Sequence, residues 1–319
     1  MLIYVLFVIG FVILIKGADL LVEGSSSLAK RYNIPDLIVG LTIVSFGTSM
    51  PELIVNVYSS LQGSSEIAVG NIIGSNISNV LLILGIAAII YPLPIHKNTM
   101  LSEIPFSLTG AILVGFLANA ALFDKSESQM LTRADGAILL FFFILFMVYI
   151  VRISQERKDV VPMDVISIMP MGKSILWILI GMTGLFLGGK WVVEGAKEMA
   201  ASFGLSESFI GLTVVAIGTS LPELVTSAIA AYKRNTDIAV GNVIGSNIFN
   251  VLWILGLSSV IKPLHFDVIN NTDILVLIFS SSLLIFAMAT SKRNTVERWD
   301  GFLFVLLYIA YMIYLIYRG

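Results

Sequence analysis

The sequence predicts an all-α membrane protein with ten transmembrane helices, arranged as two inverted repeats of five helices each. Three observations support this fold class. Hydrophobic residues make up 57% of the 319-residue chain and charged residues only 13%, whereas a soluble domain carries about 25% charged residues. Two long segments are nearly the same at a constant offset, and lysine and arginine gather in alternate loops. A soluble protein is therefore excluded.

Stretches of about 20 apolar residues, the length that crosses a bilayer, define the ten helices. The first fifteen residues are expected to form the first helix and not a removable signal, because they lack a basic start and a small-residue cleavage site. The predicted spans are residues 2–26, 36–60, 67–91, 102–121, 134–151, 173–200, 208–231, 238–261, 272–290 and 300–317.

Basic residues predict the orientation, because cytoplasmic loops are enriched in lysine and arginine. Twelve lie in one set of alternate loops and four on the opposite side. Both termini are therefore expected outside the cell membrane. The first repeat is expected at 1–151, a cytoplasmic connector at 152–172 and the second repeat at 173–319. Because each repeat has an odd number of spans, the second half is inverted. The twelve are Lys30, Arg31, Lys97, Arg152, Arg157, Lys158, Lys173, Lys233, Arg234, Lys292, Arg293 and Arg298, and the four are Lys125, Arg133, Lys262 and Arg318.

The repeat itself spans residues 40–85 and 211–256. The two copies are offset by 171 residues without a gap, and 26 of their 46 positions are identical. The matched residues are mainly Gly, Thr, Ser, Pro, Glu and Asn, whereas packing alone would preserve the aliphatic residues at least as well. We therefore interpret the repeat as a functional site and not only as a trace of gene duplication.

Each copy contains the motif G-T-S-x-P-E, which places Glu52 or Glu223 inside an apolar span. Pro51 and Pro222 lack an N–H group and interrupt a helix, so helices 2 and 7 are expected to be broken. Backbone carbonyls around 45–48 and 216–219 are then freed, which a membrane tolerates only beside protein or a polar cavity. Hydroxyls one turn before each glutamate share its helix face. They belong to Thr48, Ser49, Thr219 and Ser220.

A second motif, G-N-x-I-G-S-N-I-x-N, lies in the next span of each half. Its polar residues are spaced by four and form one stripe, and its glycines leave room for close helix packing. Helices 2, 3, 7 and 8 are therefore expected to be broken, polar-faced and to enclose one site near the membrane midplane. The stripes are Asn71, Ser75 and Asn79 in the first half and Asn242, Ser246 and Asn250 in the second, and the glycines are Gly70, Gly74, Gly241 and Gly245.

The chemistry of this site is set by oxygen atoms. Carboxylates, hydroxyls, carboxamides and carbonyls suit Ca²⁺, Na⁺ or Mg²⁺ and are poor ligands for Zn²⁺ or Cu²⁺. The chain contains no cysteine, which excludes disulfides and thiolate sites. Two carboxylates in a medium of low dielectric constant repel each other unless cations or protons neutralise them. Such a site suits an exchanger of competing ions, and intramembrane carboxylates are functional by default.

At these motifs the chain resembles the prokaryotic sodium/calcium exchangers of the calcium/cation antiporter superfamily. Both motifs occur twice at the spacing of that family, and the resemblance covers essentially the whole chain. It implies ion ligands from side chains of both halves and from two backbone carbonyls. The side chains are those of Thr48, Ser49, Glu52, Ser75, Asn79, Thr219, Ser220, Glu223, Ser246 and Asn250, and the carbonyls are those of Ser45 and Ala216.

The resemblance implies a secondary active antiporter, not an enzyme, that exchanges Ca²⁺ for Na⁺ across the cell membrane by alternating access. Ca²⁺ and Na⁺ would be transported substrates. No cofactor and no nucleic-acid partner are expected, and the monomer in its lipid bilayer is the expected functional unit. Some members, including potassium-dependent ones, have an aspartate where this chain has Asn250. With only two carboxylates in the site, the sequence speaks against K⁺ dependence.

Three alternatives stay open. A Ca²⁺/H⁺ antiporter could load protons on the same two glutamates. A cation channel is disfavoured by the inverted repeat, and an intramembrane enzyme by the lack of H-E-x-x-H or another nucleophile–base arrangement in the spans. The charged residues of helices 1 and 6 are expected to snorkel or to pair with one another, and the resemblance implies that these two helices slide across the core. They are Lys16, Asp19, Glu23, Lys190, Glu194 and Lys197.

Overall fold

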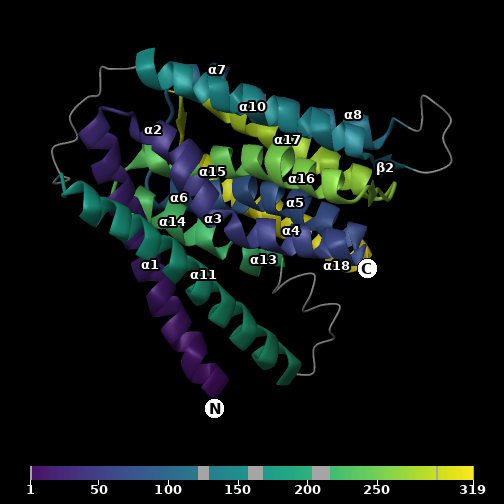
Figure 1. The fold of residues 1–319 in the computed structure, drawn as a ribbon, viewed down its shortest axis with the longest axis horizontal. Coiled ribbons are helices and arrows are strands. Elements are labelled where there is room, and N and C mark those ends of the chain that lie inside the picture. Colours follow the sequence, from purple (N-terminus) through teal and green to yellow (C-terminus); the bar gives the residue numbers. More distant parts are fainter. Residues whose placement is uncertain (1, 121–128, 157–167, 203–215, 292–293, 319) are drawn as a thin grey trace.

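The computed structural model shows an almost entirely helical chain and describes residues 2–120, 129–156, 168–202, 216–291 and 294–318 (Figure 1). This confirms the predicted all-helical membrane fold. Among the described residues, eight helices are long and apolar enough to cross a membrane, and nine if one bent pair counts as a single span. The predicted seventh span begins outside the described part, because residues 208–215 are not among these ranges.

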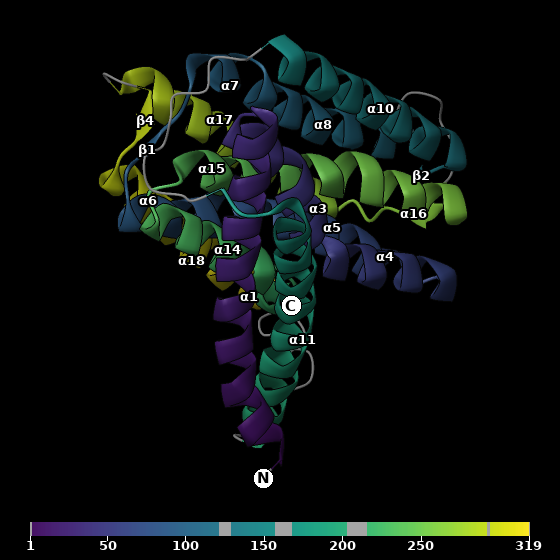
Figure 2. The ribbon, with the colours of Figure 1, turned by 60° about the vertical axis from the view of Figure 1, so that its left-hand side comes forward.

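Two long helices, α1 (Leu2–Tyr32) and α11 (Met171–Ser202), lie side by side and extend away from the other helices, with the N-terminus at the far end (Figures 1 and 2). Their backbones touch. A Cβ atom on Gly17 would lie 2.9 Å from the carbonyl oxygen of Gly181, and one on Gly181 would lie 2.8 Å from that of Gly17. Small residues permit such close packing in membranes.

The second span is bent in its middle, as predicted. It comprises α2 (Asp36–Val39), a π-helical segment η1 (Gly40–Val44), α3 (Ser45–Thr48) and α4 (Met50–Gln62), and its two parts meet at 49°. The break is at Ser49, whose ψ of 8° leaves the helical range. Pro51 then lies in the first turn of α4, where a missing N–H costs nothing.

The second half repeats this break. The helix α13 (Ala216–Thr219) is followed by α14 (Leu221–Tyr232), and between them Ser220 has a φ of −85° and a ψ of 5°. Pro222 occupies the first turn of α14. The predicted interruption of helices 2 and 7 is thus confirmed at equivalent positions.

The third and eighth spans differ from the prediction, because they are not broken. One runs through α5 (Ser65–Ser78), η2 (Asn79–Ile83) and α6 (Leu84–Ile90). The other runs through α15 (Thr236–Ile248), η4 (Phe249–Ile254) and α16 (Leu255–Ile261). The segments η2 and η4 are π-helical, so their N–H groups bond five residues back. These segments contain no proline, every N–H stays available, and the helix widens instead of breaking.

These two spans form the centre of the protein. In the most apolar stretch of α15–α16, 94% of the residues are buried, and in that of α5–α6 78%, against 22% in α18. Gly241 permits close packing as predicted, since a Cβ there would lie 2.7 Å from the carbonyl oxygen of Leu37. For Gly70 and Gly74 no described atom lies within 4 Å of such a Cβ. Residues 211–215, which the repeat makes equivalent to residues 40–44, are outside the described ranges.

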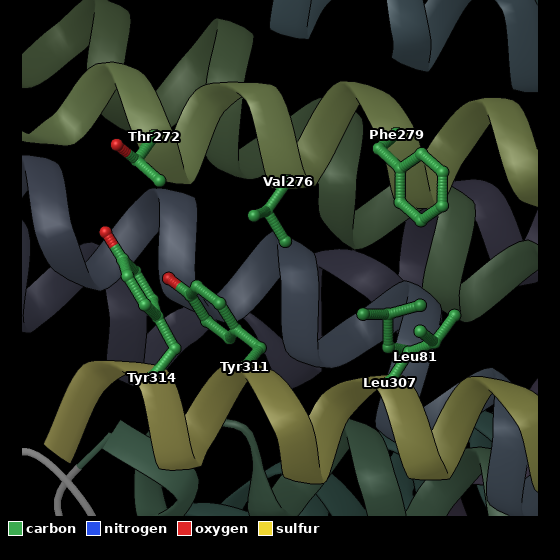
Figure 3. Close-up of a pocket in the computed structure, with 7 residues that line it drawn as sticks. All are labelled: Leu81, Thr272, Val276, Phe279, Leu307, Tyr311 and Tyr314. Carbon is green, nitrogen blue, oxygen red and sulfur yellow. The ribbon is translucent and has the colours of Figure 1, made fainter. Parts of the chain in front are cut away.

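The remaining helices surround this centre. They pack as α8 with α17, α6 with α18, and α10 with α16. Their bounds are α7 Lys97–Leu101, α8 Glu103–Ala118, α10 Arg133–Glu156, α17 Asn270–Thr290 and α18 Arg298–Arg318. An apolar cavity of about 300 Å³ opens between α17 and α18 (Figure 3), and none of its lining residues is a predicted ligand. They are Leu81, Thr272, Val276, Phe279, Leu307, Tyr311 and Tyr314.

Two short antiparallel strand pairs connect the halves. The strand β1 (Leu93–Pro94) pairs with β4 (Thr295–Val296), and β2 (Met130–Leu131) pairs with β3 (Leu264–His265). Each pair joins a loop of the first half to a loop of the second half that the spans place on the same face of the membrane. The pairing therefore agrees with the predicted alternation of the spans.

Candidate cation-binding site

Two buried glutamates lie at the breaks of the central helices. Glu52 and Glu223 are each in the first turn of the helix that follows a break, and both are 0% exposed. The Oε1 atom of each accepts a hydrogen bond. The Oε2 atom of each has no hydrogen-bond partner among the described residues. A buried carboxylate oxygen without a donor is costly, so both atoms are available for a cation.

Serine hydroxyls surround the carboxylates. Ser49 donates to Glu223 Oε1 at 2.9 Å, and this bond crosses from the first half to the second. Within each half, Ser75 donates to Glu52 Oε1 and Ser246 to Glu223 Oε1, both at 3.5 Å. The two predicted serine stripes therefore do face the glutamates.

Ser220 departs from this symmetry. It is the equivalent of Ser49, but its hydroxyl donates to Ser75 Oγ at 3.3 Å and not to the carboxylate of Glu52. These two equivalent serines thus differ in their hydrogen-bond partners.

The predicted threonines bridge the halves through asparagines. Thr48 Oγ1 donates to Asn242 Oδ1 at 3.0 Å and lies 3.4 Å from Ser246 Oγ. Thr219 Oγ1 donates to Asn71 Oδ1 at 3.4 Å. Each threonine therefore contacts the first residue of the polar stripe in the opposite half.

Ser45 does not show the freed carbonyl that the proline motif predicts. Its carbonyl oxygen accepts the N–H of Ser49 at 3.0 Å and the hydroxyl of Thr48 at 3.3 Å. The turn before the break is complete, because Ser49 still carries an N–H to donate. The Ser45 hydroxyl donates to the backbone oxygens of Gly40 at 2.7 Å and Asn242 at 3.0 Å. It thus links the second membrane span to α15 of the eighth span. Ala216 is the first residue of α13.

Four asparagines form a crosswise group at the start of the π-helical segments. Asn79 Nδ2 donates to Asn247 Oδ1, and Asn250 Nδ2 donates to Asn76 Oδ1, both at 2.9 Å. All four side chains are at most 2% exposed. The sequence interpretation missed Asn76 and Asn247, because they lie outside the stripe of every fourth residue. Their identity in both copies of the repeat was the signal that could have found them.

The arrangement is suited to hold a hard cation. Each predicted carboxylate and hydroxyl is hydrogen-bonded to another polar residue of the central helices. Among the predicted ligands, four buried acceptor oxygens have no donor from the described residues, and acceptors of this kind normally find a partner. Oxygen atoms of carboxylates and carboxamides are the ligands of Ca²⁺ and related ions. The four atoms are Glu52 Oε2, Glu223 Oε2, Asn79 Oδ1 and Asn250 Oδ1.

Comparison with known proteins finds likenesses over the whole chain. The family described as sodium/calcium exchanger protein matches residues 2–152 and 173–317. The chain is 31% identical to sodium/calcium exchanger MaX1 of Methanosarcina acetivorans, over 98% of both proteins. It is 37% identical to inner membrane protein YrbG of Escherichia coli, over 91% of this chain and 89% of that protein. A solved structure of the sodium-calcium exchanger NCX_Mj, soaked with 2.5 mM Na⁺ and 0.1 mM Ca²⁺, has a TM-score of 0.81, 32% identity and 97% coverage of both chains.

Proposed function

The chain belongs to the sodium/calcium exchanger protein family, a family of transporters, and we propose that it exchanges Ca²⁺ for Na⁺ across the cell membrane. The observation that carries the proposal is the pair of buried glutamates, one from each half, each with an oxygen atom that no described residue satisfies. Two ionised carboxylates in one buried site repel each other. Such a pair needs positive charge between its members.

In this proposal Ca²⁺ bridges Glu52 and Glu223. The hydroxyls that now donate to the carboxylates would turn their oxygens toward the ion, and the carboxamide oxygens of Asn79 and Asn250 would complete the oxygen shell. Ca²⁺ takes 6–8 oxygen ligands in flexible geometry, which a cage of many hydroxyls accommodates. The further candidate ligands are the carbonyl of Ala216 and the hydroxyls of Thr48, Ser49, Thr219, Ser220, Ser75 and Ser246. The carbonyl of Ser45 would join them once the Thr48 hydroxyl turns away from it.

Na⁺ ions would occupy the same oxygens and compete with Ca²⁺. An occupied site is neutralised and can change its access from one face to the other, whereas the empty, doubly negative site crosses the membrane interior at a high cost. This difference couples the two ions. The repeats 1–151 and 173–319 would exchange roles during alternating access, with both termini outside and residues 152–172 in the cytoplasm.

Purified protein in lipid vesicles tests the proposal. A Na⁺ gradient at equal pH on both sides is expected to drive uptake of radioactive Ca²⁺, and removal of the gradient to stop it. If only a pH gradient drives uptake, the protein is a Ca²⁺/H⁺ antiporter and the sodium proposal is wrong. If Ca²⁺ moves without any counter-ion, the protein conducts as a channel.

The membrane potential gives a second measurement on the same vesicles. If more than two Na⁺ ions move for each Ca²⁺, each net charge gains about 2.3 kcal/mol per 100 mV. Uptake at equal ion gradients would then depend on an imposed potential, while an exchange of two Na⁺ for one Ca²⁺ would not.

A further inference from the structure

Asn76 and Asn247 are buried beside the cation site but are not among its proposed ligands. We propose that they are positioning residues, which turn the carboxamide oxygens of Asn250 and Asn79 toward the bound cation. The proposal rests on the proposed function only in that the site must bind a cation. It assigns a task to two residues that are 1% and 2% exposed and identical in both copies of the repeat.

The orientation begins at two backbone carbonyls. Asn76 Nδ2 donates to the carbonyl oxygen of Asn247 at 3.0 Å, and Asn247 Nδ2 donates to that of Asn76 at 3.5 Å. The nitrogen and oxygen of a carboxamide look alike in shape, so their positions follow from the partners. A backbone carbonyl only accepts. The nitrogen of each side chain must therefore face it, and the side-chain oxygen must point the other way.

The second step fixes the outer pair. Because Asn247 Oδ1 can only accept, Asn79 must turn its nitrogen toward it, at 2.9 Å. In the same way Asn76 Oδ1 accepts from Asn250 Nδ2 at 2.9 Å. The opposite ends of the two outer carboxamides are oxygens, and these are the two that have no partner among the described residues.

We call these four hydrogen bonds the asparagine relay. The relay decides which end of the Asn79 and Asn250 carboxamide dipoles faces the ion. Without it, Asn79 and Asn250 could turn over at little steric cost and present their N–H groups, which repel a cation. The relay also crosses between the halves, because Asn76 orients Asn250 and Asn247 orients Asn79. It further suits an asparagine at position 250, since an aspartate would set a negative oxygen against Asn76 Oδ1.

A double-mutant cycle tests this pairing on the purified full chain. Ca²⁺ binding is measured by calorimetry for Asn76→Leu, Asn250→Ala and the combination of both. Leucine fills the space of asparagine and cannot accept a hydrogen bond. Each single change is expected to weaken Ca²⁺ binding about tenfold. The coupling between the two residues would then also be about tenfold, a size found for residues in contact. The combination is expected to be no weaker than the weaker single variant, because Asn76 acts only through the Asn250 carboxamide.

The matched control combines Asn76→Leu with Asn79→Ala. Because Asn76 does not hydrogen-bond to the side chain of Asn79, the two losses are expected to multiply. If the effects of Asn76→Leu and Asn250→Ala multiply in the same way, the positioning role is wrong and Asn76 only supports the packing. Thermal unfolding without Ca²⁺ checks the fold, and Asn76→Ala enters the same cycle if the leucine variant does not fold.

Failure of the proposed function gives a different result. A wild-type protein that binds Ca²⁺ with the expected cycle, but shows no uptake driven by Na⁺, overturns the exchange and keeps the relay. If the wild-type protein exchanges the ions normally, but the effects multiply both for Asn76→Leu with Asn250→Ala and for Asn76→Leu with Asn79→Ala, only the positioning role is wrong. A protein that binds neither Ca²⁺ nor Na⁺ overturns both.

Discussion

Single side chains differ between the two halves even where the sequence is the same. Ser49 donates to the carboxylate of the opposite half, whereas its equivalent Ser220 donates to Ser75. A hydrogen bond to a charged group contributes about 1.5–3 kcal/mol, roughly twice a neutral one. The carboxylates of Glu52 and Glu223 therefore lie in unequal surroundings. Equivalent hydroxyls of the site can thus donate to a carboxylate or to another hydroxyl.

Replacement of either glutamate by glutamine tests the shared site. Glu52→Gln and Glu223→Gln each remove one negative charge and keep the shape. In the proposed site each glutamate forms an ion pair with the bound Ca²⁺, and loss of one partner of a buried ion pair costs about 3–5 kcal/mol. Ca²⁺ uptake into vesicles is therefore expected to fall at least about a hundredfold in each variant.

Glu103→Gln is the control for this prediction. Glu103 is also a fully buried acid, but it lies in α8, where it accepts a hydrogen bond from Tyr149 at 2.7 Å. Uptake is expected to persist in this variant. Intact uptake in Glu52→Gln or in Glu223→Gln would show that the two glutamates do not share one ion.

Helices 2 and 7 owe their bend to a proline that follows a residue outside the helical range. A proline inside a continuous helix costs about 3 kcal/mol, so Pro51 excludes a straight span. The break turns the Ser49 hydroxyl toward the opposite half. In helices 3 and 8 the π-helical segments begin at Asn79 and Phe249 and keep the span continuous while they widen it beside the asparagines.

Pro51→Ala is expected to lower Ca²⁺ uptake at least about tenfold without lowering the thermal stability. Alanine supplies the missing N–H and permits a straight helix, which moves the Ser49 hydroxyl away from Glu223. Uptake and Tm are measured on the same preparation. Pro105→Ala in the first turn of α8 is the control and is expected to leave uptake unchanged. A variant with low uptake and a much lower Tm would indicate that Pro51 acts on folding.

The contact between α1 and α11 predicts a stability effect. Gly17→Ala would place a Cβ 2.9 Å from the carbonyl oxygen of Gly181, and overpacking of this kind costs about 1–3 kcal/mol. Tm in detergent is expected to fall. Gly172→Ala is the control, because no described atom lies within 4 Å of its added Cβ and alanine favours a helix. An unchanged Tm for Gly17→Ala would mean that the two helices separate easily.

Across the whole molecule, the connection between α1 and the central helices is one-sided. Lys233, in the turn after α14, pairs with Asp19 and with Glu23 at 2.7 Å, both on α1. The equivalent position in the first half is Gln62, which has no charge. Asp19 and Glu23 thus have a partner outside α1, which the expectation of snorkelling or mutual pairing did not include. On α11 mutual pairing is found, since Lys190 lies 3.8 Å from Glu194.

Lys233→Gln gives the second half the residue of the first. Partly exposed ion pairs contribute about 0.2–1 kcal/mol each, so loss of both is expected to change the half-saturation for Ca²⁺ by a factor between about two and about thirty. The shift is expected in opposite directions at the two faces, because the pairs stabilise one access state. Uptake into vesicles of each orientation measures it, and high salt is expected to reduce it. Lys190→Gln is the control, and an equal shift at both faces would show that the ion pairs of Lys233 do not favour one access state.

Much of the fold and part of the site could be predicted from the sequence, for physical reasons. Apolar length locates the spans, and the proline motif locates the break near Ser49. The π-helical segments could not be predicted, since they depend on how neighbouring helices pack. Asn76 and Lys233 were missed because their partners, Asn250 and α1, are distant in the chain. Local periodicity cannot show a hydrogen bond that spans 174 residues.

The glycine contact between α1 and α11 also has a mechanical consequence. The strand pairs β1–β4 and β2–β3 join loops of the two halves by backbone hydrogen bonds at both faces. They thus hold the helices of the two halves together. The helices α1 and α11 take part in neither pair. Because their backbones are in contact at Gly17 and Gly181, we expect the two helices to behave as one rigid unit. A force that displaces either helix would then displace both, while the strand pairs would help the other helices to keep their arrangement.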